Sequence, residues 1–197
     1  DIAKKGLSVI DNEDMDDRLR GLQKNILYMA LGNSNRELQN YRQAVLDYKN
    51  ALKYISYTQN VDESDALSGI GNCFEHAEMP DSALVYLEKA ERLYQLRCDA
   101  TSRPRIINSL ELGVTLSRKG ENLKAQEYLK NAEKGFELLQ DNELLTYVYV
   151  YLYQNSKDLG NQELINKYSD LIKQYIKTVK EDNSRTSKIC FSTYASI

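Results

Sequence analysis

The chain has 197 residues with a formal net charge of −3, and only two of them are prolines. Its length allows a substantial core, and 28 per cent charged residues with so little proline suit a helical protein. The charge balance gives no reason to expect nucleic-acid binding, which needs a clustered basic surface. No apolar run approaches the roughly 18 residues of a membrane-spanning helix, so no membrane span is expected.

The chain begins with a segment that we interpret as the trailing helix of a preceding repeat plus a linker, over residues 1–20. Ile2, Leu7 and Ile10 would pack one face of that helix, and the acidic stretch that follows is the connection. Asp14 or Asp16 is expected to cap the next helix. Helices are then predicted at 17–36, 41–57, 63–77, 81–96, 103–118, 122–139, 142–157 and 161–180.

Prolines and glycines in the sequence indicate where the predicted helices begin and end. Pro80 and Pro104 fit the first turn of a helix, where a missing N–H costs little. Gly120 and Gly160 fit the turns between paired helices, where a positive φ is easy for glycine. The tyrosines of residues 147–153 alternate with aliphatic residues, as in a strand, but the surrounding repeat register favours a helix.

A spacing of small residues recurs three times along the chain. In each case a glycine is followed after twelve residues by an alanine and after seven more by another alanine. The triplets are Gly32, Ala44 and Ala51; Gly71, Ala83 and Ala90; and Gly113, Ala125 and Ala132. A small residue at a fixed place in every unit indicates a close helix crossing, and units that each bury a face on the next form a solenoid.

The units also share aromatic and aliphatic positions around these residues, as in Tyr28, Leu31, Tyr41 and Tyr48 of the first unit. With the small residues, this pattern resembles the tetratricopeptide repeat family. The resemblance implies an all-α fold, a right-handed superhelical solenoid of antiparallel helix pairs. It implies four such pairs over residues 21–180, the third and fourth progressively irregular, and a polar tail or the start of a further helix over 181–197.

The repeats are longer than the usual period of about 34 residues. The glycines Gly32, Gly71 and Gly113 stand 39 and then 42 residues apart. Longer repeats of this kind resemble signalling-type members of the family, including bacterial receptors for short peptides. Because both ends of the chain read as parts of further elements, we expect a domain of a longer protein.

The sequence offers little that points to an enzyme. Cys73 and His76 share a helical face and could form a nucleophile pair, but no third orienting group is evident, and a packed cysteine is the simpler interpretation. Cys73, Cys98 and Cys190 lack the close spacing of a zinc site. We therefore expect no catalytic residue, metal or other cofactor. The odd number of cysteines slightly favours a reducing compartment such as the cytoplasm.

The resemblance places the first helix of each pair on a concave groove. Side chains three and four apart share a helical face, so the residues around each packing glycine form stripes. The carboxamides of Asn33 and Asn72 are expected to hold a peptide backbone, and Met29, Leu110, Val114 and Val150 its apolar side chains. The full predicted peptide-binding set is Met29, Asn33, Arg36, Ser68, Asn72, Glu75, Leu110, Val114, Tyr147, Val150 and Gln154.

Two other interpretations of these surfaces stay open. The asparagines are equally well explained as solvated helix residues. A second candidate surface consists of tyrosines on the second helices, which are also plain packing residues. These tyrosines are Tyr54, Tyr57, Tyr86, Tyr94, Tyr128 and Tyr175.

The favoured function is that of a scaffold or adaptor that binds a protein or peptide. The alternative is the peptide-sensing domain of a bacterial transcriptional or signalling regulator whose output domain lies outside this sequence. A homo-oligomer is compatible with either.

Overall fold

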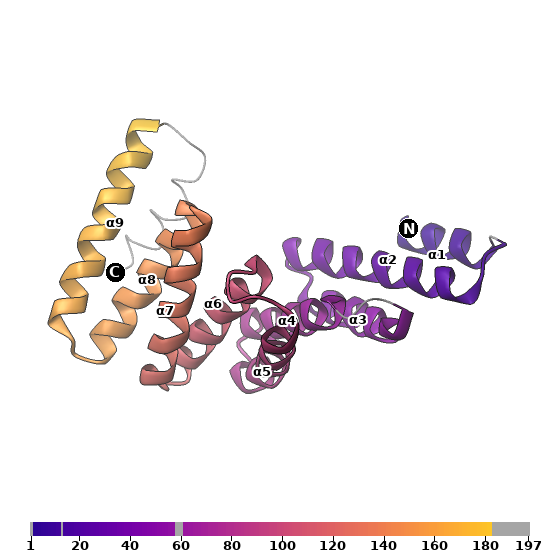
Figure 1. The fold of residues 1–197 in the computed structure, drawn as a ribbon, viewed down its shortest axis with the longest axis horizontal. Helices are drawn as coiled ribbons and strands as arrows, with labels where there is room; N and C mark the ends of the chain where they lie inside the picture. The colour runs from indigo at the N-terminus through magenta and orange to yellow at the C-terminus, as the bar shows by residue number, and fades with distance from the viewer. Residues whose placement is uncertain (1, 13, 58–60, 183–197) are drawn as a thin grey trace. The chain divides into compact units, whose positions relative to one another are not determined.

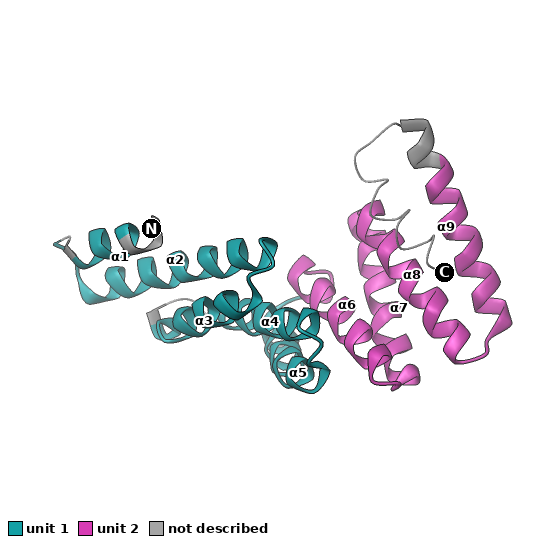
Figure 2. Ribbon diagram, turned by 180° about the vertical axis from the view of Figure 1, so that it is seen from behind, with its two compact units in different colours: residues 1–99 teal, residues 100–197 magenta. Residues whose placement is uncertain are grey.

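The structure is a computed structural model that describes residues 2–12, 14–57 and 61–182 (Figure 1). Every regular element in these ranges is a helix. The chain divides into two compact units, residues 1–99 and residues 100–197 (Figure 2). Each unit is built from antiparallel helix pairs, so the predicted all-helical repeat architecture is confirmed.

Unit 1 contains two helix pairs and a shorter leading helix. The pairs are α2 with α3 and α4 with α5, and α4 also packs against both helices of the first pair. The leading helix α1 packs along α2 (Figure 1). The elements are α1 (Ile2–Asn12), α2 (Asp17–Glu37), α3 (Tyr41–Leu52), the 3-10 helix η1 (Ile55–Tyr57), α4 (Val61–His76) and α5 (Pro80–Arg97).

Unit 2 contains the other two pairs, α6 with α7 and α8 with α9. Helix α8 packs against α7 and also contacts α6. The elements are α6 (Arg103–Arg118), α7 (Asn122–Leu139), α8 (Asn142–Asp158) and α9 (Gln162–Asp182). One hydrophobic core joins all four helices, with Leu129, Phe136, Leu152 and Tyr168 among its fully buried members.

The recurring small residues mark the crossing inside each of the first three pairs. A methyl group added at Gly32 would lie 2.6 Å from the ring of Tyr48. At Gly71 and at Gly113 it would lie 2.6 Å from Cγ of the leucine sixteen residues later in the chain. The alanines of the triplets are fully buried at the same crossings, which explains why the spacing recurs: Ala44, Ala51, Ala83, Ala90, Ala125 and Ala132.

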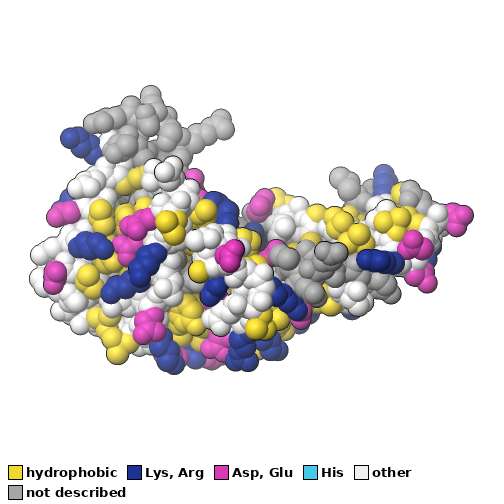
Figure 3. Space-filling view, in the orientation of Figure 1, with side chains coloured by type: hydrophobic (Ala, Val, Ile, Leu, Met, Phe, Trp, Pro, Cys, Tyr) yellow, Lys and Arg dark blue, Asp and Glu magenta, His cyan; other side chains and the backbone are white. Residues whose placement is uncertain are grey.

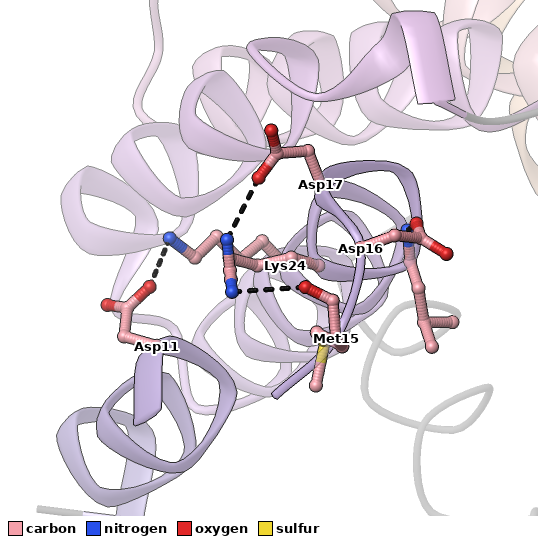
Figure 4. Close-up of polar contacts among 7 residues, drawn as sticks. Asp11, Met15, Asp16, Asp17 and Lys24 are labelled. Atoms are coloured by element: carbon pink, nitrogen blue, oxygen red, sulfur yellow. Dashed lines mark hydrogen bonds and ion pairs between the residues drawn. The ribbon is translucent and has the colours of Figure 1, made fainter. Parts of the chain in front are cut away.

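The start of α2 is fixed by the capping interaction that the sequence predicts. The Asp16 carboxylate accepts a hydrogen bond from the backbone N–H of Leu19 at 2.7 Å (Figure 4). Lys24 of α2 forms an ion pair with Asp11 of α1 at 2.5 Å, and this hydrogen bond raises the pKa of Lys24 above its ordinary value. The polar contacts in Figure 4 therefore hold α1 and the connection onto α2.

The helix boundaries agree with the predicted ones to within a few residues, with one larger difference. The second predicted helix was expected to reach residue 57, but α3 ends at Leu52 and a turn of 3-10 helix follows. The segment with alternating tyrosines lies within α8 and is helical. There Val148 and Leu152, four residues apart, are buried together, as the helical period requires.

The turns inside the four pairs share a left-handed residue. Gly120 and Gly160 have φ of 75° and 66°, as predicted from their place in the sequence. In the first two pairs the same place is taken by Gln39 and Glu78, with φ of 61° and 57°. A side chain in this region is strained, so the conformation there is imposed by the pairing of the helices.

Candidate peptide-binding site

The predicted stripes of unit 1 come from two helices that touch each other. Met29, Asn33 and Arg36 lie on α2. Ser68, Asn72 and Glu75 lie on α4. Met29 is partly buried against the core that contains Ile70 of α4. The structure thus brings the α2 and α4 stripes together within one unit.

Asn33 is exposed and is oriented by Tyr48, one of the aromatic residues of the repeat pattern. The hydroxyl of Tyr48 donates a hydrogen bond to Oδ1 of Asn33 at 2.7 Å. Tyr48 is 1 per cent exposed, its ring lies between Gly32 and Gly69, and burial raises its pKa to about 12. Because the side-chain oxygen of Asn33 accepts this bond, its Nδ2 group is the part left to meet a ligand.

Asn72, at the equivalent place on α4, is nearly enclosed. Only 6 per cent of the residue is exposed, and its carboxamide makes no hydrogen bond to another residue of the described ranges. A partly enclosed carboxamide of this kind gains most from a ligand that brings both a donor and an acceptor. A peptide main chain has both.

The remaining α4 residues have partners inside the protein. The Tyr94 hydroxyl donates to Asp65 at 2.6 Å and also hydrogen-bonds Ser68. Glu75 is 3 per cent exposed, and its Oε2 lies 3.7 Å from Nδ1 of His76. Ser68 and Glu75 therefore belong to internal polar contacts as well as to the predicted stripe.

The stripe residues of unit 2 are mostly core residues. Leu110, Val114 and Val150 are 4, 3 and 6 per cent exposed and belong to the unit's hydrophobic core. All three pack into this core, where α6 contacts α8. Tyr147 is partly buried and its hydroxyl lies 3.1 Å from that of Tyr151, whereas Gln154 is exposed.

The tyrosines of the second helices do not form one exposed surface. Tyr94 is fully buried, and Tyr54 stacks on Tyr28 with ring centroids 6.1 Å apart. Tyr86 is partly exposed and stacks on Phe74 at 5.5 Å. Tyr128 and Tyr175 are partly buried, and the side chain of Tyr57 lies outside the described part of the structure.

Unit 1 also has an apolar hollow that the sequence does not indicate. A hollow of about 320 Å³ opens between α3 and the carboxyl-terminal end of α4. Its position could have been found only from the packing of the two helices, because its residues come from two separate segments, 41–46 and 73–79. Tyr41, Val45, Leu46, Cys73, Phe74 and Met79 are among the residues that line it.

The structure adds no support for catalysis at Cys73. Cys73 is buried at 1 per cent exposure, while His76 stacks on Tyr41 with ring centroids 5.2 Å apart. Among the residues that the structure describes, no group of three or more His, Cys, Asp or Glu side chains could hold a metal ion. No helix in the described ranges is long and apolar enough to cross a membrane.

Comparison with known proteins shows similarity in structure only. No protein-family model matches the sequence, and no curated protein sequence matches it. The structure of BtubC (BKLC) from P. vanneervenii is similar with a TM-score of 0.79 and 16 per cent identity, over 91 per cent of this chain and 72 per cent of that chain. A Podosopora anserina kinesin light chain with TPR-like repeats has a TM-score of 0.66 and 12 per cent identity, over 92 and 87 per cent.

A third similar structure is a regulator. It is the Rap conjugation gene regulator of the plasmid pLS20 in complex with a Phr peptide, with a TM-score of 0.63 and 17 per cent identity. The match covers 94 per cent of this chain and 56 per cent of the regulator, so this chain corresponds to about half of that protein. Together with the helix pairs and the glycine crossings, these similarities show that the chain has the fold of tetratricopeptide-type repeat proteins.

Proposed function

We propose that this chain is a protein- or peptide-binding repeat domain whose α2–α4 face holds an extended peptide. Asn33 and Asn72 contact the peptide main chain, Met29 contacts an apolar side chain, and Arg36 and Ser68 supply polar contacts beside them. Contact with the buried Glu75 would need a local change in packing. The observation that carries the proposal is the hydrogen bond from Tyr48 to Asn33, which directs the carboxamide of an exposed residue.

The two carboxamides suit a backbone better than a particular side chain. Asn33 offers its Nδ2 donor and Asn72 offers both a donor and an acceptor, and the peptide main chain has the complementary groups at every residue except proline. Asn72 is partly desolvated already, so little further ordering is needed when a ligand binds. This arrangement would bind many sequences and leave specificity to the neighbouring side chains.

In unit 2 the proposal involves fewer residues. Tyr147 and Gln154 are the accessible members of the predicted set, and Leu110, Val114 and Val150 support them from the core. Contact of a ligand with these three aliphatic residues would need a change in the packing of α6 and α8.

A second candidate function is the peptide-sensing domain of a bacterial regulator. The similarity to a Rap regulator solved with its peptide favours it, since this chain spans only part of such a protein. The output domain would then lie outside the present sequence. The flanking sequence of the full-length gene distinguishes the two functions: a helix-turn-helix segment favours the regulator, and further repeats favour a scaffold.

The proposal is tested by selecting ligands from a displayed random-peptide library on the 197-residue chain and measuring their affinity for variants. Asn33→Ala and Asn72→Ala should each weaken binding about tenfold to a hundredfold, because a hydrogen bond in a desolvated site is worth about 1–3 kcal/mol. The melting temperature of each variant should stay close to that of the parent. Asn131→Ala, which removes an exposed asparagine of α7, is the matched control and should bind normally.

Normal binding by both stripe variants would contradict the proposal. Loss of binding in Tyr86→Ala with the asparagine variants unaffected would place the ligand on the other side of the helix pairs.

A further inference from the structure

The hollow between α3 and α4 lies on a face of unit 1 that the predicted stripes do not include. Its walls are apolar: Val45 and Leu46 of α3, Phe74 near the end of α4, and Met79 in the turn that follows. Leu46 and Met79 are 50 and 48 per cent exposed, so apolar surface at the hollow is open to solvent. At about 320 Å³ the hollow is at the lower end of the size of ligand sites.

One basic side chain lines this apolar hollow, and two more lie over the aromatic ring beside it. Arg42 lines its rim, and Lys49 follows two turns later on the same side of α3. The ammonium groups of Lys49 and Lys89 lie 6.0 and 5.9 Å from the ring centroid of Tyr86. Tyr86 in turn stacks on Phe74, so the aromatic wall connects the hollow to both lysines.

These cations have no acidic partner of their own. Arg42, Lys49 and Lys89 are exposed, and none of them forms an ion pair with an acidic residue of the described ranges. In a chain with a net charge of −3, these three cations are available to the carboxylates of a ligand. Figure 3 shows that hydrophobic and basic side chains are interspersed on the face that it draws, not separated into one broad apolar area.

We propose that this α3–α5 face, defined by Arg42, Val45, Lys49, Phe74, Tyr86 and Lys89, binds a second protein segment with one large apolar side chain between carboxylates. The apolar side chain enters the hollow against Phe74, and the carboxylates meet Arg42 and the two lysines. The charge complementarity selects an acidic segment over a neutral one. The site is separate from the α2–α4 stripe, so the two proposals can be tested independently of each other.

The hollow and the charges make distinct contributions. Burial of the apolar side chain supplies affinity in proportion to the area removed from water. The exposed cations act mainly on association and on selectivity, and their effect weakens when salt screens them. Binding should therefore require both parts and fall as the ionic strength rises.

The test uses short synthetic peptides with a fluorescent label and the full 197-residue chain, with affinity measured by fluorescence polarisation. One peptide has a central leucine between glutamates, a second replaces the leucine with serine, and a third replaces the glutamates with lysines. The first should bind at least about tenfold more tightly than the others. Methyl NMR should show shifts at Val45 and Ala77, which line the hollow.

Variants locate the binding. Lys49→Glu should weaken the acidic leucine peptide at least about tenfold, and Ala77→Phe, which fills the hollow, should do the same. Lys130→Glu is the matched control, because Lys130 stands at the same place of α7 as Lys49 does of α3, and it should leave binding unchanged. Circular dichroism checks that each variant is folded. If Ala77→Phe does not fold, the test rests on the affinity of Lys49→Glu.

Several results would overturn the proposal. These are no binding of any peptide at about 1 mM, equal binding of the leucine and serine peptides, or an equal effect of Lys49→Glu and Lys130→Glu. Self-association in sedimentation experiments that Lys49→Glu abolishes would also overturn it, by assigning the face to a second copy of the chain.

Discussion

The α3–α4 junction of unit 1 and the α7–α8 junction of unit 2 occupy the same place in the repeat but are built from different side chains. Phe74 stands three residues after the crossing residue Gly71, and Asn155 stands one place earlier in the repeat, at the position of Cys73. Phe74 stacks on Tyr86 and leaves the apolar hollow open. Asn155 is fully buried and donates from Nδ2 to the backbone oxygen of Asn122 at 3.0 Å.

The comparison shows that one helix-pair geometry tolerates two kinds of junction. A directional hydrogen bond closes the α7–α8 junction, since a buried amide is costly unless it is paired. Non-directional apolar contacts form the α3–α4 junction, so small mismatches in shape leave space there. A repeat can therefore acquire a binding surface at a junction without change in its crossing residues.

The largest effect is expected at the aromatic wall of unit 1. Phe74→Ala removes the ring that contacts Tyr86 and the core beside it, and should lower the free energy of unfolding by about 3 kcal/mol. Chemical denaturation followed by circular dichroism measures the change. Phe74→Leu keeps most of the apolar volume and should lose clearly less. An equal loss for both variants would mean that the aromatic stacking, not the volume, is what stabilises this junction.

The hydrogen bond of unit 2 should matter somewhat less. Asn155→Leu leaves the Asn122 carbonyl without its side-chain donor and should cost about 1–3 kcal/mol in the same measurement. Gln154→Leu changes the exposed neighbour and should stay within about 0.5 kcal/mol of the parent. If Asn155→Leu is as stable as the parent, the two junctions do not differ in the way described.

Tyr48 and Leu129 occupy equivalent crossings, and only the tyrosine carries a hydroxyl. Tyr48→Phe removes the bond to Asn33 and should cost about 0.5–1.5 kcal/mol at neutral pH. Burial raises the pKa of Tyr48 from 10.0 to about 12, so the folded state holds its proton more tightly than the unfolded state.

The pH dependence of this contribution follows from that direction. It is present in full below pH 10 and is lost as the pH rises toward 12, because the unfolded chain releases the proton first. Stability measured across this range should fall less steeply for Tyr48→Phe than for the parent. Parallel curves for the two proteins would contradict the raised pKa.

The smallest effect concerns the left-handed turns. Gln39→Gly should stabilise unit 1 by up to about 1 kcal/mol, because glycine adopts a φ of 61° without strain. Gly120→Ala should destabilise unit 2 by a similar amount, although a methyl group there would meet no atom within 4 Å. Thermal unfolding of both variants compares the two turns, and a gain in stability for Gly120→Ala would show that its turn is not held in the left-handed region.

Of the candidate site, the sequence indicated the helices and the residue types but not the surroundings of each side chain. The equivalent places of Asn33 and Asn72 follow from the repeat register. The bond from Tyr48 that orients Asn33 does not, because it joins two helices whose separation is set by packing. For the same reason the burial of Leu110 and Val114 could not be read from their position on α6 alone.

The sequence by itself determined the helix pairs and their crossings, because glycine and alanine at a fixed spacing are needed wherever two backbones approach closely. It also determined the turns at Gly120 and Gly160, since few residues other than glycine take a positive φ without cost. Only the tertiary structure decided which side chains are covered and which remain open. That outcome depends on how residues far apart in the chain fill a shared volume, as at the hollow beside Phe74 and the buried bond of Asn155.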